Sequence, residues 1–284
     1  MSRFFSALAL AALLLAGSRT TVRADVIAAA PIPDRIAAAD MVVIGKITAI
    51  EDKTVMGKRY ATDKDKTEFK VALIQIAEPL KGAKGLTHVR LGFVPPVVRP
   101  APAGNARPAI FRFPQLNHAV GQEGCFFLAK SADGDLHVTR MYFDVMEKKE
   151  PNFEQEMTLA RRAAKLLEEP LAGLKSKDAE DRLMTASMLL TKYRGYRPGQ
   201  NNSKLEPVGA EESKLILTAI AEGDWSRREP QKLSAQSVFQ RLALTAKDGF
   251  NPPQFKDYQK EFPAYAQQWL KDNMDKYRVQ RFAQ

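Results

Sequence analysis

The chain has 284 residues, of which 45% are hydrophobic and 27% charged, so it can bury one or two cores without disulfide staples. The formal net charge is +10, but most cations have acids close by in sequence, which indicates a solvated charged surface and disfavours a nucleic-acid-binding stripe. A single cysteine, Cys125, excludes an internal disulfide framework.

Residues 1–24 have the pattern of a secretory signal peptide. Arg3 precedes an apolar run that is shorter than the roughly 20 residues of a membrane-spanning helix, and Val22-Arg23-Ala24 forms a V-x-A cleavage site before Asp25. Ser18 stands where a lipoprotein signal would place cysteine. We therefore expect a periplasmic or extracellular protein without a membrane span or lipid anchor. A buried N-terminal helix is the alternative.

Short runs that alternate between apolar and polar residues follow the leader and predict β-strands. An Asp133-Gly134 pair between the last two runs is typical of a hairpin turn. Five or six strands that close on themselves would form an OB-like β-barrel over residues 25–150. The runs are Met41–Glu51, Glu68–Leu80, Thr87–Phe93, Cys125–Lys130 and Leu136–Phe143.

Cys125 shares a strand face with Phe127 and Ala129, which favours a buried side chain over a thiol that pairs between molecules or acts as a nucleophile. Alternation places His88 and His137 on polar faces, and His118 lies in a turn-like segment. No two of the three histidines have the spacing of a metal motif, and no nucleotide-binding or hydrolase motif is present. The sequence predicts no cofactor, no metal site and no catalytic residue.

The segment Phe93–Gln115 contains six prolines and three arginines, Arg99, Arg107 and Arg112, with no acid. Because proline cannot donate to a sheet ladder, the segment is not a central strand. Two interpretations remain: a stiff crossover loop, or a cationic arm that contacts a partner.

After Pro151 the apolar residues recur at helical spacing, which predicts an α-helical domain of four to six amphipathic helices over residues 151–284. Asp178 and Ser234 are expected N-caps, and Pro263 is expected at a first helical position. Glycines after two of the helices, Gly195 and Gly249, are expected to end them.

Aromatic and cationic side chains gather near the end of the second predicted helix, as Tyr193, Arg194, Tyr196 and Arg197. They form either an interaction patch or a capping cluster, because both uses favour these residue types. By contrast, the helical spacing of Tyr258, Phe262, Tyr265 and Trp269 predicts a core stripe.

Three strands of the first half resemble the OB-like barrel of tissue inhibitors of metalloproteinases and netrin-type modules. Those inhibitors chelate a target's zinc through an amino-terminal cysteine, which the expected start at Asp25 lacks, so the resemblance implies the fold alone. The helical half is similar to HEAT-like helix pairs, and the two halves in series resemble uncharacterised secreted bacterial proteins. The matching positions are Ala39, Asp40, Val42, Gly45 and Ile47; Val71, Ile74, Lys81 and Gly82; and Gly121, Phe127 and Leu128.

Taken together, the export signal and the absence of catalytic motifs predict a non-catalytic binding protein of the periplasm or cell surface, with another exported protein or an acidic surface polymer as partner. Two alternatives remain. One is an exported hydrolase whose site is assembled from distant residues, for example His118 with acids of the helical half. The other is a barrel-type inhibitor that works without the cysteine wedge.

Overall fold

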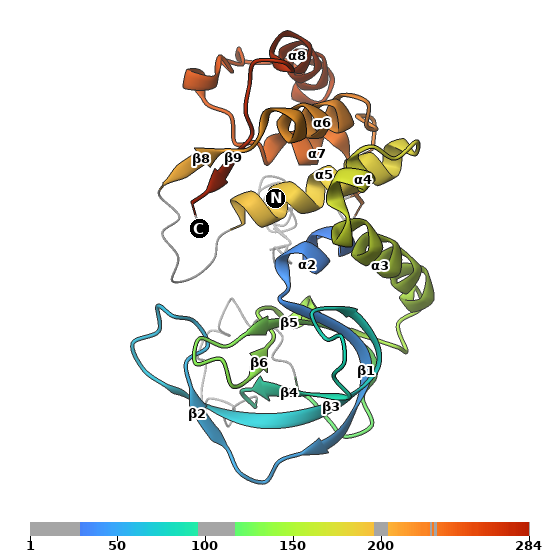
Figure 1. Ribbon diagram of the computed structural model, residues 1–284, viewed down its shortest axis with the longest axis vertical. Coiled ribbons are helices and arrows are strands. Elements are labelled where there is room, and N and C mark those ends of the chain that lie inside the picture. Colours follow the sequence, from blue (N-terminus) through green and yellow to red (C-terminus); the bar gives the residue numbers. More distant parts are fainter. Residues whose placement is uncertain (1–28, 96–116, 196–203, 228, 230–231, 284) are drawn as a thin grey trace, which may run out of the picture. The chain divides into compact units, whose positions relative to one another are not determined.

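A computed structural model describes residues 29–95, 117–195, 204–227, 229 and 232–283 (Figure 1). These residues form a seven-stranded sheet, a two-stranded sheet and α-helices, so the predicted α+β class is confirmed. The expected signal peptide lies outside the described residues, as does most of the proline-rich segment.

The large sheet contains a strand in each of the five runs predicted from alternation. β1 pairs antiparallel with both β3 and β5, so the pairings run β1-β3-β4-β6-β5 and return to β1. β4 and β6 pair in parallel, β2 extends the β3 ladder, and β7 pairs with β5. The strands are β1 (Met41–Ile50), β2 (Val55–Gly57), β3 (Thr67–Lys81), β4 (His88–Phe93), β5 (Glu123–Lys130), β6 (His137–Val138) and β7 (Val145–Glu147).

The strand predicted for residues 136–143 is wrong beyond Val138. The chain instead forms a short 3₁₀ helix, Tyr142–Asp144, because the Asp144 carboxylate accepts the backbone N–H groups of Arg140 and Met141, both at 2.7 Å. Such a local side-chain bond competes with a sheet ladder. β7 then begins at Val145 and was not expected.

Both faces of β5 are buried, against two different clusters of side chains. Phe126 and Leu128 pack with Val43 and Ile47 of β1 in a cluster made by the strands themselves. Cys125 and Phe127 face the other way and pack in a cluster shared with the helices. The prediction that Cys125 is buried is confirmed: it has no exposed surface, and burial raises the pKa of its thiol to about 12.

The helices predicted from periodicity are present, although some boundaries differ. Asp178 and Ser234 are N-caps as expected. Pro263 is not at a first helical position, because Asp257 accepts the N–H of Lys260 and begins the last helix earlier. The helices are α2 (Ile32–Ala38), α3 (Phe153–Glu168), α4 (Pro170–Leu174), α5 (Ala179–Arg194), α6 (Ala210–Ala221), α7 (Ala235–Gln240) and α8 (Tyr258–Asn273), and the small sheet pairs β8 (Leu205–Pro207) with β9 (Gln280–Phe282).

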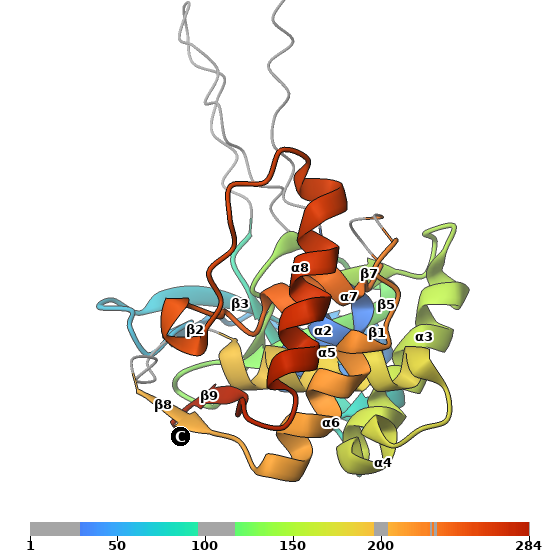
Figure 2. The same ribbon diagram turned by 90° about the horizontal axis from the view of Figure 1, so that it is seen from above.

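Helix α5 lies at the centre of the helical part. It was predicted to be amphipathic, with one apolar face, but it is buried on all sides along its middle. Its residues Leu183 to Leu190 are all buried, because α2, α3, α4, α6 and α7 pack around it. Gly173 of α4 allows one of these close contacts, since a Cβ there would lie 2.5 Å from Thr185 Oγ1. Figure 2 shows α8 lying across α6 and α7, where Trp269 and Phe262 contact Phe239 of α7.

Helix α2 precedes β1 and packs against α3 and α5, although it belongs to the sequence predicted as a β domain (Figure 1). Its carboxyl end is capped by Lys81 at the end of β3, whose Nζ donates to the carbonyls of Ile36 (2.8 Å), Ala37 (3.1 Å) and Ala39 (2.5 Å). A cation at this end also complements the helix dipole. The domain boundary predicted at residue 150, with two parts that fold independently, stays a prediction.

A buried ion pair fixes the other side of α2. The carboxylate of Asp34, which is 4% exposed, accepts two hydrogen bonds of 2.6 Å from the guanidinium of Arg241, the residue after α7. Ser187 (2.6 Å) and Thr191 (3.2 Å) of α5 donate to the same carboxylate oxygen. The charges of Asp34 and Arg241 therefore neutralise each other, and the network joins α2, α5 and the end of α7.

We predict that breaking this ion pair destabilises the fold far more than breaking an exposed one. Arg241→Met alone should lower the free energy of unfolding by about 3–5 kcal/mol, because it leaves the buried charge of Asp34 uncompensated. Asp34→Leu alone should cost less, because the side chain of Arg241 is 26% exposed and keeps part of its hydration. The double variant should lose much less than the sum, since no unpaired charge remains. Denaturant unfolding measures all three.

The matched control is Arg161→Met, which removes the exposed bidentate pair of Arg161 with Glu78. That change should cost at most about 1 kcal/mol. Strictly additive losses at Asp34 and Arg241 would contradict the prediction.

Candidate functional site: the Arg35 pocket

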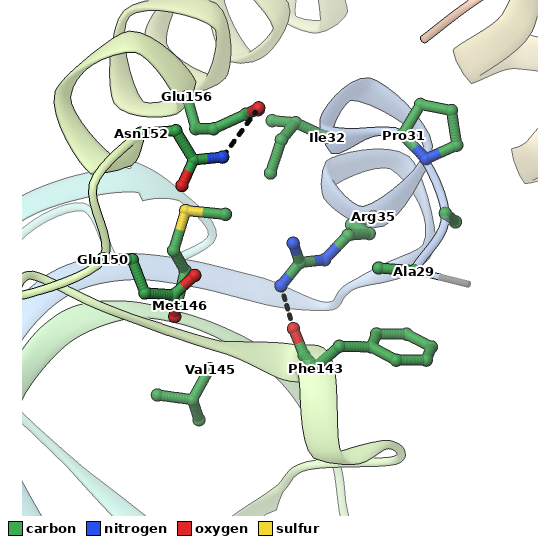
Figure 3. Close-up of a pocket in the computed structure, with 11 residues that line it drawn as sticks. Ala29, Pro31, Ile32, Arg35, Phe143, Val145, Met146, Glu150, Asn152 and Glu156 are labelled. Carbon is green, nitrogen blue, oxygen red and sulfur yellow. Dashed lines mark hydrogen bonds between the residues drawn. The ribbon is translucent and has the colours of Figure 1, made fainter. Parts of the chain in front are cut away.

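A pocket of about 350 Å³ lies beside α2, between the segment that leads into this helix, the strand β7 and the start of α3. Figure 3 shows the side chains that line it. Its polar members are Arg35, Glu150, Asn152 and Glu156, and Ile32 and Met146 are among its apolar members. Positive and negative groups therefore face one small, partly apolar space.

Arg35 is the most unusual of these residues, because it is 7% exposed and no carboxylate of the described residues lies within ion-pair distance of it. Its Nη2 donates to the backbone carbonyl of Phe143, and its Nε is buried without a hydrogen-bond partner. The guanidinium carbon lies 3.9 Å from the centre of the Phe127 ring. This cation–π contact offsets part of the cost of burial but satisfies no N–H donor.

Burial lowers the pKa of Arg35 from its ordinary value, and the charges of Asp144, Glu150 and Glu156 oppose that shift. The guanidinium stays protonated, since arginine does not lose its proton in proteins. The pocket therefore contains a desolvated positive charge whose acidic neighbours act from beyond contact distance.

The acids of the pocket are held by weak or backbone contacts. Glu147 donates its backbone N–H to Glu150 Oε1 at 2.8 Å, and the side-chain amide of Asn152 lies 3.5 Å from Glu156 Oε1. In the part of the chain that the structure describes, neither acid forms an ion pair with Arg35 or with a lysine.

The pocket exists because two adjacent charged residues of α2 point in different directions. Neighbouring helical residues lie about 100° apart, so Asp34 faces α5 and α7 while Arg35 faces β5 and the pocket. The sequence contained a signal for both: the segment IPDRIAA places an acid and a base inside an apolar run. Sequence reasoning missed it because the first element expected was the strand at Met41.

The binding residues predicted from sequence are only partly described. Arg99, Arg107, Arg112, Tyr196 and Arg197 lie outside the described residues. Tyr193 is half-buried, and its hydroxyl donates to Glu212 of α6. Burial, with the hydrogen bond to Glu212, raises the pKa of Tyr193.

Arg194 also contacts its own fold, since its guanidinium lies 5.5 Å from the ring centre of Phe282 in β9. These contacts tie Tyr193 and Arg194 to α6 and the small sheet. Whether they also bind a partner stays a prediction.

His118, the histidine considered for a hydrolase, is 3% exposed and packs edge-on against Phe93. Its Nδ1 lies 3.0 Å from Gln122 Oε1, and Gln122 in turn donates to Glu147 at 3.3 Å. Its Nε2 is buried without a partner, and burial lowers the pKa of the ring. Within the described ranges, no hydrogen bond joins His118 to a serine, threonine or cysteine.

The described residues contain no cluster of three histidine, cysteine, aspartate or glutamate side chains that could hold a metal ion. None of their helices has both the length and the apolar character that crossing a bilayer requires.

Comparisons with known proteins add no family assignment. No protein-family model matches the chain, and no curated protein matches it.

We predict that His118 makes the protein less stable as the pH falls. Because its pKa is lowered in the folded state, the unfolded chain binds a proton below about pH 6.5 that the folded chain does not. The free energy of unfolding should decrease between about pH 6.5 and the lowered pKa, by at most about 1.4 kcal/mol per pH unit.

Denaturant unfolding from pH 7 to pH 5 checks this prediction. His118→Gln should have a flatter pH dependence than the wild type. His137 also has its pKa lowered by burial and keeps its own contribution in every variant. Parallel curves for the wild type and His118→Gln would count against the assignment.

Proposed function

We propose that this chain is a non-catalytic, exported binding protein that holds the carboxylate of a small ligand against Arg35. The observation that carries the proposal is a buried guanidinium that lines a pocket and forms no ion pair with any residue that the structure describes. A buried charge without a partner is costly, and this cost falls when an anion enters the pocket.

A carboxylate suits the geometry of the guanidinium. Nη2 is engaged with Phe143, and Figure 3 shows the other terminal nitrogen directed into the space between Met146, Asn152 and Ile32. A charge-assisted hydrogen bond in such a desolvated place is stronger than one at the surface. The apolar side of the pocket would bury the body of the ligand.

Export supports a binding role and is itself part of the proposal. If the leader is removed at the V-x-A site, protein recovered from the periplasm or medium has Asp25 as its first residue and a formal charge of +7, because three arginines and no acid are lost. Intact-mass analysis measures this directly. Full-length protein confined to the cytosol would overturn it.

We further propose that the large sheet is an OB-type barrel. The support is the pairing order, in which β5 returns to β1 over Met41 to Lys46 and β4 pairs in parallel with β6. The resemblance to inhibitor and netrin modules stays a proposal, and so does the inhibitor function. No contact among the described residues supports either one. An experimental structure in which β5 and β1 are unpaired would refute the barrel.

The binding proposal predicts that a simple carboxylate stabilises the folded protein. Titration with 4-methylpentanoate should raise the Tm in a concentration-dependent way, because the ligand binds only the folded chain. The uncharged 4-methylpentanamide should have no effect at the same concentrations. This ligand-side comparison needs no variant and therefore does not depend on how Arg35 substitutions fold.

Variants then locate the site. Arg35→Gln should abolish the stabilisation, Arg35→Lys should retain part of it, and the exposed Arg161→Gln should leave it unchanged. Equal responses to the acid and the amide, or an undiminished response in Arg35→Gln, would refute the proposal.

A further inference from the structure

The Arg35 pocket contains charges of both signs that do not neutralise one another. Arg35 lies on α2, whereas Glu150 and Glu156 come from the end of the β7 segment and from α3. Among the described residues no ion pair joins Arg35 to either acid, although all three line the same space. The backbone therefore holds a cation and two anions apart across a small volume.

Two other acids near the pocket, Glu123 and Glu147, form ion pairs with lysines, whereas the two pocket acids do not among the described residues. Glu123 forms ion pairs with Lys46 (3.1 Å) and Lys148 (3.0 Å), and Glu147 forms one with Lys149 (2.5 Å). Lys148 and Lys149 precede Glu150 in the chain, yet both point to other acids. Glu150 and Glu156 are thus left as the unneutralised side of the pocket.

This charge arrangement selects among small ligands. A plain carboxylate gains from Arg35 but is repelled by two acids, and a plain amine gains from the acids but is repelled by Arg35. A molecule that carries both charges gains from both sides, because each of its groups meets an opposite charge. Arg35 and the two glutamates can then each pair with the ligand without moving toward one another.

The apolar lining limits the rest of the ligand. Pro31, Ile32 and Met146 offer aliphatic surface beside the charges, and a pocket of about 350 Å³ has room for a small molecule with a short hydrocarbon side chain. The two charged groups of a free α-amino acid are close together, and its side chain projects away from both.

We propose that the ligand is a zwitterion of the class of free aliphatic α-amino acids, with its carboxylate on Arg35 and its ammonium on Glu150 and Glu156. This inference rests on the proposed binding function, because it assigns the same pocket. It adds the second charge and names the residues that recognise it.

The experiment compares three probes that share one hydrocarbon skeleton. L-leucine carries both charges, 4-methylpentanoate lacks the ammonium, and 3-methylbutylamine lacks the carboxylate. By calorimetric titration of the wild type, L-leucine should bind at least about tenfold more tightly than either single-charge probe, because a second desolvated ionic contact contributes about one decade or more.

Variants assign the ammonium contact. In Glu150→Gln/Glu156→Gln the advantage of L-leucine over 4-methylpentanoate should fall below about twofold, while binding of 4-methylpentanoate should be unchanged or tighter once the repulsion is gone. Glu154→Gln is the matched control, since Glu154 lies on the same helix but does not line this pocket, and it should keep the full advantage. Thermal unfolding confirms that each variant is folded.

The outcomes separate the two proposals. If L-leucine and 4-methylpentanoate bind equally well to the wild type, the zwitterion inference is wrong and the carboxylate-binding function stands. If the amine binds as tightly as L-leucine, or if the double variant keeps the preference, the inference is also overturned. If neither acid nor amino acid binds, both proposals fail together.

Discussion

The ion pair between Asp34 and Arg241 is the constraint on which the candidate site depends. It is buried, bidentate and supported by Ser187 and Thr191, so it fixes α2 against α5 and the end of α7. A helix of only seven residues has little stability of its own and takes its position from tertiary contacts. Because Arg35 is the next residue, the direction of its side chain follows from the position of Asp34.

Lys81 completes this placement from the opposite side. Its three bonds to the last carbonyls of α2 connect the helix to the end of β3, and Gly82 follows with a positive φ, where the chain passes close to Asp40. A side chain at Gly82 would meet the Asp40 carbonyl at a Cβ distance below van der Waals contact. The Lys-Gly pair noted in the sequence thus has a local structural role, which is to join the sheet to the helix that bears the pocket arginine.

The parts of the fold that could be predicted from sequence are those with a readable period. β1, β3 and β4 alternate over enough residues to be recognised. The burial of Cys125 was predicted from the apolar residues on its own strand face, whereas the structure buries both faces of β5. α2 could not be recognised, since seven residues give barely two turns and its two charges resemble a loop. The full burial of α5 was also hidden, because Ser187 looks like an exposed polar position until its hydroxyl is seen to donate to Asp34, a residue from a distant part of the chain.

The site itself was beyond sequence reasoning for a related reason. Arg35 and Arg241 both bond to groups inside the fold, and nothing in their local sequence distinguishes their roles. Arg241 meets a carboxylate and two hydroxyls, so its charge is compensated within the chain and serves stability. Arg35 meets one carbonyl and an aromatic ring, and the acids that could neutralise it are kept beyond contact. A buried charge without an ion-pair partner lowers the stability of the folded protein, and Arg241 shows that this fold can pair a charge in its interior. The unpaired charge of Arg35 lies beside a pocket, and this is the physical reason for assigning ligand recognition to Arg35.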